Sequence, residues 1–190
     1  MLPYVCLVRH GETAWSASGQ HTGRTDIPLT DRGEEAARAL QVRLAEMSFS
    51  DVFTSPLQRA RRTCELAGFG ALAKADPDLV EWGYGEYEGR RTAEILAADP
   101  TWRPFEAGYP GGETAADVGV RADRIISRAR ACSGNVLLFG HRDMFRILAA
   151  RWLQFAPIEG RRFYLDTGGI SVLGYDHNLN EPAVRLWNGR

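Results

Sequence analysis

Short apolar runs alternate with longer amphipathic segments along this chain of 190 residues. A short apolar run that ends at polar residues or glycine is typical of a buried strand. On this basis, strands are predicted at Val5 to Val8, Asp51 to Thr54, Asp78 to Val80 and Asn135 to Phe139. The segment from Gly168 to Trp187 predicts two more strands around a turn at residues 177–180.

Apolar residues recur at helical spacing in the segments between these strands. Thr30 and Thr114 are suited to cap two of the predicted helices, because a threonine hydroxyl accepts hydrogen bonds from the first free backbone N–H groups. Pro56 is expected near the first position of another helix. The predicted helices are one after Thr30 with Ala36, Ala37, Leu40, Leu44 and Met47 on one face, Gln58 to Ala67, Thr92 to Ala98, one after Thr114 with Val118, Ala122, Ile125 and Ile126 on its core face, and Asp143 to Leu153.

Two stretches lack this periodicity, namely a polar loop from Gly11 to Pro28 and an irregular flap from Trp102 to Gly112. Strands that alternate with helices predict an α/β fold, a three-layer sandwich with a mostly parallel central sheet and helices on both faces. The last two strands are expected to add an antiparallel edge. Since the chain has no repeat, linker or low-complexity segment, residues 1–190 are predicted to form a single domain.

Composition narrows the range of partners. Hydrophobic residues make up 44% of the chain, charged residues 25%, and the net charge is −1, so no basic field attracts nucleic acid or an anionic membrane. No apolar stretch reaches the roughly 18 residues that span a bilayer, and no secretory leader pattern is present, which predicts a cytoplasmic protein. The three cysteines form no CxxC pair, which argues against a disulfide framework or a zinc site. The apolar C-terminal hairpin offers a surface on which two copies could associate as a homo-oligomer.

Two strand ends share one chemical pattern, because the first strand ends in Arg9-His10-Gly11 and the later one in Gly140-His141-Arg142. The carboxyl ends of neighbouring parallel strands meet at one rim of a sheet, where ligands bind. Two imidazoles at that rim can hold a phosphoryl group between a nucleophile and a hydrogen-bond donor. The alternatives are a histidine that serves the structure alone and a metal site. The metal site is a weaker prediction than the phosphoryl site, because no HxH, HExxH or Asp-rich group supplies further ligands. We expect neither a metal nor a cofactor.

Arg59 follows the second strand directly and lies in the first turn of the next helix. A helix N-terminus beside an arginine is a natural phosphate site. Arg61 and Arg62 are interpreted as a solvated basic face.

A loop rich in glycine, aromatic residues and carboxylates begins at Glu81. Cleavage of a phosphoester needs a proton for the leaving oxygen, and a carboxyl group beside apolar rings has a raised pKa. Glu81, directly after a predicted strand, is therefore the candidate general acid. Glu86 and Glu88 are interpreted as turn or salt-bridge residues, and the aromatic residues of the loop as packing groups or, for Tyr84, a substrate contact.

These segments together resemble the histidine phosphatase superfamily, which includes cofactor-dependent phosphoglycerate mutases and many phosphatases. The resemblance implies that His10 is the phosphohistidine nucleophile, that Arg9, Arg59 and His141 surround the transferred phosphoryl group, and that Glu81 protonates the leaving oxygen. The segments that carry it, in family order, are Leu7 to Thr13, Thr54 to Ala60, the Glu81 loop with Tyr87-Glu88-Gly89, and Gly140-His141.

The chain departs from the common pattern of that family at three places. Ser16 replaces an asparagine, Thr22 before Gly23 replaces a glutamine, and Arg142-Asp143 replace small residues. Arg142 is expected to hold a second anionic group of the substrate, and Gly11, Ser16, Thr22, Gly23 and Tyr84 are further candidate phosphate or substrate contacts.

A narrower resemblance to the sedoheptulose 1,7-bisphosphatase-like branch, in residues 18–23, 81–89 and 166–173, implies a sugar phosphate or bisphosphate substrate. The sequence therefore predicts a metal-independent phosphomonoesterase that acts on a phosphorylated small molecule. A phosphoglycerate mutase and a non-catalytic phosphate-binding module are the alternatives.

Overall fold

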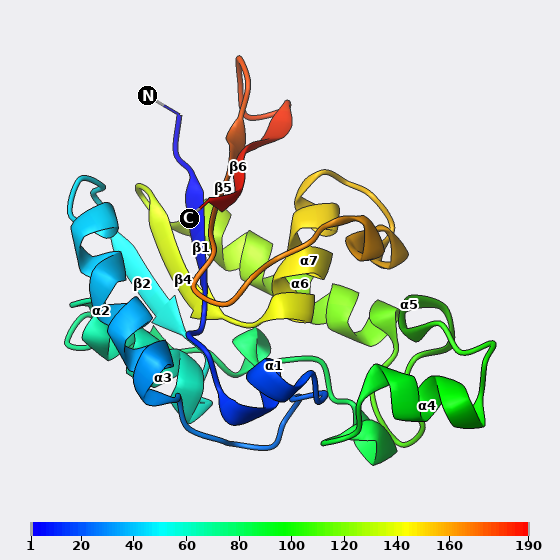
Figure 1. Ribbon diagram of the computed structural model, residues 1–190. Coiled ribbons are helices and arrows are strands. Elements are labelled where there is room, and N and C mark those ends of the chain that lie inside the picture. The colour runs from blue at the N-terminus through cyan, green and yellow to red at the C-terminus, as the bar shows by residue number, and fades with distance from the viewer. Residues whose placement is uncertain (1, 190) are drawn as a thin grey trace.

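The computed structural model describes residues 2–189 and contains one six-stranded sheet in the order β3-β2-β4-β1-β5-β6 (Figure 1). Neighbours among β1, β2, β3 and β4 pair in parallel, whereas β5 pairs antiparallel with β1 and β6 antiparallel with β5. The predicted α/β class, the mostly parallel sheet and the antiparallel C-terminal edge are therefore confirmed. The strands are β1 (Val5–Arg9), β2 (Asp51–Thr54), β3 (Ala73–Ala75), β4 (Val136–Gly140), β5 (Ile170–Tyr175) and β6 (Pro182–Gly189).

The central strand β1 separates two apolar cores. Val5 and Leu7 pack in one core, whereas Cys6 and Val8 pack in the other, as alternation along a strand requires. Full burial of a side chain the size of Leu7 contributes about 1.5–3 kcal/mol. A strand that is apolar on both faces is stable only when helices cover both.

Helices cover both faces of the sheet (Figure 1). Leu40 of α2 (Asp31–Leu44) and Cys64 of α3 (Gln58–Leu66) join the core of Cys6 and Val8. Residues of α6 (Ala115–Ala131) and α7 (Arg142–Trp152) join the core of Val5 and Leu7. None of the helices formed by residues 2–189 is both long and apolar enough to cross a membrane.

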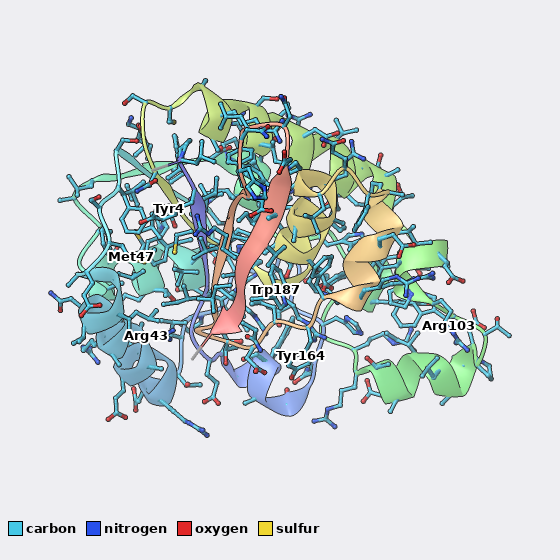
Figure 2. All side chains as sticks on the ribbon, turned by 90° about the horizontal axis from the view of Figure 1, so that it is seen from above. Tyr4, Arg43, Met47, Arg103, Tyr164 and Trp187 are labelled. Carbon is cyan, nitrogen blue, oxygen red and sulfur yellow. The ribbon has the colours of Figure 1, made fainter. Side chains whose placement is uncertain are left out.

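Short elements gather beyond the carboxyl ends of the parallel strands (Figure 1). In Figure 2 the flap residue Arg103 lies on the opposite side of the molecule from α2. Tyr164 and Trp187 lie between them, near the middle of that view, and the Trp187 indole donates to the Tyr164 carbonyl at 2.5 Å. The short elements are α1 (Ala14–Ser18), α4 (Thr92–Ala98), α5 (Pro104–Ala107), and the 3₁₀ helices η1 (Pro77–Leu79), η2 (Gly85–Tyr87) and η3 (Pro157–Arg162).

The strand predicted at Asp78 to Val80 is wrong. The Asp76 side chain accepts a hydrogen bond from the backbone N–H of Asp78 at 2.9 Å, and Pro77 opens the 3₁₀ helix η1 instead. The third parallel strand is β3, a three-residue edge strand that is largely exposed. Because β3 lacks an apolar run, its sequence carries no strand signal.

Two segments predicted as irregular contain short helices, and one boundary is shifted. The loop from Gly11 to Pro28 includes α1, which a reciprocal capping box between Thr13 and Ser16 begins. The flap from Trp102 to Gly112 includes α5. Pro56 lies one residue before the N-cap of α3, Leu57, so it leads into the helix without being part of it.

Candidate active site

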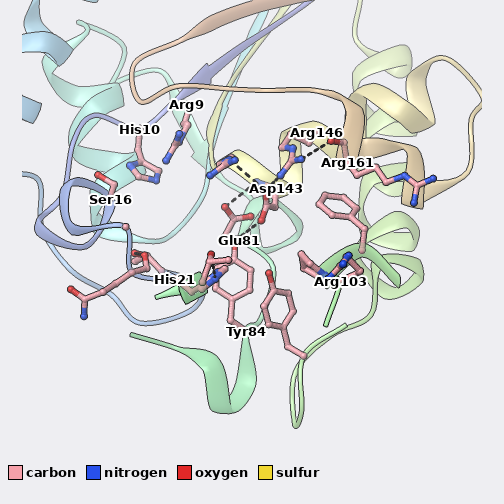
Figure 3. Close-up of a pocket in the computed structure, with 18 of the residues that line it drawn as sticks. Arg9, His10, Ser16, His21, Glu81, Tyr84, Arg103, Asp143, Arg146 and Arg161 are labelled. Atoms are coloured by element: carbon pink, nitrogen blue, oxygen red, sulfur yellow. Dashed lines mark hydrogen bonds and ion pairs between the residues drawn. The ribbon is translucent and has the colours of Figure 1, made fainter. Parts of the chain in front are cut away.

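A cavity of about 490 Å³ lies at the carboxyl ends of β1 and β4. In Figure 3 Arg9, His10 and Ser16 lie at one end of it and Arg103 and Arg161 at the other, with Glu81 and Asp143 between them. The predicted site residues that line it are Arg9, His10, Ser16, Thr22, Glu81, Tyr84 and Arg142. Four other predicted site residues do not line the cavity and lie behind its wall, namely Gly11, Gly23, Arg59 and His141.

His10 directly follows β1, and its imidazole is buried in the wall of the cavity. His10 Nδ1 lies 2.7 Å from the Gly11 carbonyl oxygen, which only accepts hydrogen bonds, so Nδ1 carries the proton. The lone pair is therefore on Nε2. Burial first, and the charges of Arg9 and Arg59 second, lower the pKa of His10 well below 6.5, so the ring is neutral and able to act as a nucleophile.

His141 comes directly after β4, and its ring centroid lies 5.2 Å from that of His10. The two rings are neighbours because Arg9 pairs with Gly140 in the parallel ladder. Arg59 Nε lies 3.2 Å from His141 Nδ1 and always donates, so the His141 proton is on Nε2, which lies 2.8 Å from Ser55 Oγ. This ring therefore offers a donor where His10 offers a lone pair.

Arg59 is completely buried, and its guanidinium joins the loop after α1 to the sheet. It donates to the carbonyl oxygens of Gly23 and Thr25 at 2.7 and 2.9 Å and to that of Thr22 at 3.3 Å. Arg59 therefore holds both His141 and this loop in place, and it lies behind the cavity surface.

The amide groups of the same loop bind the carboxylate of Glu88. The backbone N–H groups of Gly23, Arg24 and Thr25 donate to it at 3.1, 2.9 and 3.3 Å, and that of Tyr84 at 3.2 Å. Sequence reasoning missed this organising role and assigned Glu88 to a turn or salt bridge. The only signal available was its place in the Tyr87-Glu88-Gly89 segment of the family pattern.

Gly11 and Gly23 occupy positions that leave no space for a side chain. A Cβ on Gly11 would lie 2.5 Å from the carbonyl oxygen of Gly33, in the first turn of α2. A Cβ on Gly23 would lie 2.5 Å from the carbonyl oxygen of Trp82. Both glycines therefore allow two backbone segments to approach closely.

Glu81 is buried, and its carboxylate accepts three backbone hydrogen bonds. The N–H groups of Trp82 and Met144 donate to Oε1 at 2.9 Å, and that of Asp143 donates to Oε2 at 3.1 Å. Burial first, and the nearby charge of Asp143 second, raise the pKa of Glu81 against the effect of these donors. The sequence predicted that Glu81 directly follows a strand. That prediction is wrong, because residues 77–79 form the 3₁₀ helix η1.

Arg9 and Arg142 bring positive charge to the cavity. Arg9 Nη1 donates to the Leu165 carbonyl at 2.6 Å, and burial and the neighbouring Arg142 charge lower the pKa of Arg9 to about 10, so it is charged at neutral pH. Within residues 2–189, neither Arg9 Nε nor Arg142 Nε has a hydrogen-bond partner, although both atoms are buried. A buried unsatisfied donor costs about 1–3 kcal/mol, and a bound anion removes that cost.

The hydroxyl groups predicted to contact substrate already have protein partners. Ser16 Oγ donates to the Thr13 carbonyl at 3.0 Å and accepts from the Thr13 N–H at 2.9 Å. Thr22 Oγ1 donates weakly to the Gln20 carbonyl at 3.3 Å. Tyr84 Oη donates to Asp143 Oδ2 at 2.7 Å. These groups therefore shape the wall of the cavity in this structure.

An aromatic cluster, which the sequence did not identify, borders the same cavity. The His21 ring makes edge contacts with Tyr84, Trp102 and Tyr109 at centroid distances of 5.1, 5.9 and 5.8 Å. Burial lowers the pKa of His21 below 6.5. Phe105 lines the cavity beside this cluster. These rings give the cavity an apolar wall, and Arg146 lies over the Phe105 ring at 4.7 Å.

An α/β sheet with paired imidazoles of complementary protonation and unsatisfied arginines at one rim defines an enzyme of phosphoryl transfer. Comparison with known proteins identifies the family. Residues 5–189 match the histidine phosphatase superfamily (branch 1), so the chain belongs to that superfamily, and it is a phosphatase. The resemblance in the sequence is thereby confirmed.

Curated relatives and a solved structure agree with this membership. The chain is 38% identical to an acid phosphatase of Mycobacterium tuberculosis, with 94% of this chain and 89% of the relative covered. It is 32% identical to the sedoheptulose 1,7-bisphosphatase of Saccharomyces cerevisiae, with 98% and 93% covered. A solved structure of an open-reading-frame product of M. tuberculosis superposes with a TM-score of 0.92 at 35% identity, covering 98% of this chain and 97% of the other.

Proposed function

We propose that the chain hydrolyses phosphomonoesters through a phosphohistidine formed on His10. The observation that carries this proposal is the Nδ1–H···O contact of 2.7 Å to Gly11, which leaves the Nε2 lone pair of a neutral ring free in the cavity wall. Nε2 attacks phosphorus, the P–N bond forms, and the bond from phosphorus to the leaving oxygen breaks. Water then attacks the phosphohistidine, and inorganic phosphate leaves.

Arg9 and His141 stabilise the transferred phosphoryl group, with Arg59 acting from behind. Among residues 2–189, the Nε of Arg9 has no hydrogen-bond partner and would be satisfied by an anion beside His10. The Nε2–H of His141 donates to Ser55 Oγ at 2.8 Å in this structure and would exchange that acceptor for the anion. Donors fixed in position before the reaction stabilise developing charge without reorganisation, which is the main source of rate in phosphoryl transfer. Arg59 contributes positive charge and fixes the proton position on His141.

Glu81 supplies the proton for the leaving oxygen and recovers one from the attacking water. Its burial and its raised pKa favour the protonated carboxyl group that a general acid needs. No step in this scheme requires a metal ion. Among residues 2–189, the one His and carboxylate group close enough to hold an ion is Asp176, His177 and Glu181, which is exposed at the β5–β6 turn and outside the cavity.

The substrate is a sugar phosphate or a sugar bisphosphate. A cavity of about 490 Å³ is of the size that holds a small metabolite. In the part of the chain that the structure describes, the buried Arg142 Nε has no hydrogen-bond partner, so it could donate to a second anionic group. One of the relatives is a sugar bisphosphatase. The aromatic rings of the cavity wall provide an apolar surface for the sugar ring.

A panel of phosphate esters tests this function. Phosphate release is measured in the presence of EDTA from sugar bisphosphates, sugar monophosphates, phosphoglycerates and p-nitrophenyl phosphate. The proposal expects undiminished hydrolysis under EDTA and the highest kcat/KM for a sugar bisphosphate. Transfer between positions of phosphoglycerate without phosphate release would instead identify a mutase, and phosphate binding without turnover would identify a binding module.

A further inference from the structure

Asp143 is a second carboxylate in the cavity, and phosphate-ester chemistry as described above leaves it without a role. It is the second residue of α7, it is 7% exposed, and it lines the cavity beside Glu81 (Figure 3). A buried carboxylate costs desolvation free energy and repels an anionic substrate, so its presence in this site needs an explanation. Its immediate contacts indicate what that purpose is.

Three side chains hold Asp143 in the charged form. Arg146 Nη1 lies 2.6 Å and Arg142 Nε 3.8 Å from Asp143 Oδ1, and the Tyr84 hydroxyl donates to Oδ2 at 2.7 Å. Burial opposes ionisation, but the two arginines and the tyrosine outweigh it and hold the pKa of the Asp143 carboxyl below its usual range. The carboxylate therefore carries a fixed negative charge.

Glu81 and Asp143 are joined through the first turn of α7. The backbone N–H of Asp143 donates to Glu81 Oε2 at 3.1 Å, and the next N–H, of Met144, donates to Oε1 at 2.9 Å. No side chain donates to the Glu81 carboxylate among the hydrogen bonds of residues 2–189. The protonation of Glu81 is therefore governed by neighbouring charge and by burial.

Most of the other charge around Glu81 favours its ionised form. The guanidinium groups of Arg9, Arg59 and Arg142 attract a negative charge there, and so do the N–H groups at the N-terminus of α7. Burial is the largest effect that raises the pKa of Glu81, and the charge of Asp143 is the next, so the two together oppose the arginines and the N–H groups. The charged and titratable groups that face it are Arg9 from β1, Arg59 from α3, Arg121 from α6, Arg142 and Asp143 from α7, Tyr84 from its own loop and Tyr109 from the flap.

We propose that Asp143 is a positioning residue whose fixed negative charge keeps the catalytic proton on Glu81. The pair shares one proton, and the arginines around Asp143 direct it to Glu81. This inference rests on the proposed role of Glu81 as general acid. It assigns a function to the Arg142-Asp143 departure from the family pattern that is separate from substrate binding.

The charge of Asp143 acts in both halves of the reaction. In the first half, Glu81 gives its proton to the leaving oxygen as the bond from phosphorus to that oxygen breaks, and two carboxylates then face each other. Their repulsion raises the affinity of Glu81 for a proton. In the second half, Glu81 takes a proton from the water that attacks the phosphohistidine, so the starting state returns and the protons balance.

Asp143→Asn tests the proposal, because it removes the charge and retains an oxygen that accepts from Tyr84. Two measurements are made on the wild type and the variant. One is the pH profile of kcat/KM for a phosphate ester of a simple alcohol. The other is the infrared titration of the protonated Glu81 carboxyl, assigned by its loss in Glu81→Gln. Both the alkaline limb of the profile and the midpoint of the infrared titration are expected to move to lower pH by about one unit.

Two further variants separate the charge of Asp143 from a structural effect. Asp143→Glu restores the charge and is expected to return both midpoints toward the wild-type values. Glu106→Gln removes one negative charge from the far wall of the cavity, where Glu106 pairs with Arg161 at 2.7 Å, and is expected to leave both midpoints in place.

The outcomes distinguish the inference from the function on which it rests. An unchanged infrared midpoint in Asp143→Asn, or an equal shift in Glu106→Gln, overturns the role of Asp143. A shifted infrared midpoint with an unchanged kinetic profile supports the coupling between the carboxyls and overturns Glu81 as the general acid.

Discussion

Arg59 Nε lies 3.2 Å from His141 Nδ1 and fixes the proton of that imidazole on Nε2. The same guanidinium binds the carbonyl oxygens of residues 22, 23 and 25. One buried side chain therefore sets both the protonation of His141, the proposed phosphate donor, and the path of the loop beside it. This dual attachment distinguishes Arg59 from an arginine that only contacts substrate.

Replacement of Arg59 by methionine is expected to affect both stability and catalysis. Loss of the guanidinium leaves buried carbonyl groups unsatisfied, which lowers the free energy of unfolding by about 3 kcal/mol. It also releases the proton position of His141, and loss of that one oriented donor lowers kcat by about 10²–10³. Urea denaturation and steady-state kinetics measure the two effects. Arg62→Met is the matched control on the same helix, because Arg62 is 44% exposed and pairs with Glu34 on the surface. Equal effects of the two replacements would contradict the role given to Arg59.

Glu81→Gln separates proton donation from the other contributions to catalysis. Glutamine retains an oxygen for the backbone donors and has no proton to give at neutral pH. Hydrolysis of alkyl phosphates is expected to fall by about 10²–10⁴, and hydrolysis of p-nitrophenyl phosphate far less, because that leaving group is stable as an anion. The ratio of kcat/KM for the two substrates is the measurement. A proportional loss on both would remove Glu81 from the acid role.

Glu88→Ala is expected to loosen the loop at residues 22–25. Arg59 binds the carbonyl groups of this loop, and Glu88 binds its N–H groups. Four backbone N–H groups lose their acceptor, which lowers the free energy of unfolding by about 2–3 kcal/mol. Hydrogen exchange of the amides at residues 23–25 is expected to speed up, and kcat/KM to fall as the phosphate site loosens. Glu86→Ala, two residues away and exposed, is the control and is expected to change neither. Unaltered exchange in Glu88→Ala would contradict this account of the loop.

Arg142→Ala tests the second anionic group of the substrate. A hydrogen bond to a charged group contributes about 1.5–3 kcal/mol, so kcat/KM for a sugar bisphosphate is expected to fall about 10- to 100-fold. The value for p-nitrophenyl phosphate is expected to change little, and the ratio between the two substrates is the readout. Arg151→Ala, on the same helix but paired with Asp123, serves as the control. A uniform loss on both substrates would show that Arg142 does not recognise a second anion.

The sequence predicts the paired imidazoles because two independent strand signals end in the same chemical pattern. Val5 to Val8 and Val136 to Phe139 are apolar without interruption, and parallel strands bring their carboxyl ends together, so His10 and His141 become neighbours. The structure places them directly after adjacent strands, with a ring-centroid separation of 5.2 Å. Strands that are buried on both faces have continuous apolar sequences, so they are the elements that the sequence predicts most directly.

The parts that the sequence did not predict depend on contacts between distant residues. Glu88 binds amides of residues 23–25, and Asp143 binds Tyr84, and neither pairing leaves a periodic pattern. The short edge strand β3 is largely exposed, so it has no apolar run to reveal it. The apolar residues of Asp78 to Val80 predict a strand. The local hydrogen bond from the Asp78 N–H to the Asp76 side chain favours a 3₁₀ turn instead.

Trapping of the covalent intermediate tests the central claim most directly. Wild-type enzyme is mixed with a ³²P-labelled sugar bisphosphate, denatured within milliseconds in alkali, where a phosphohistidine is preserved, and digested to locate the label. The label is expected on His10 Nε2 and is expected to disappear in His10→Ala, which retains the fold but loses turnover. Label on any other residue, or continued turnover in His10→Ala, would contradict nucleophilic attack by His10.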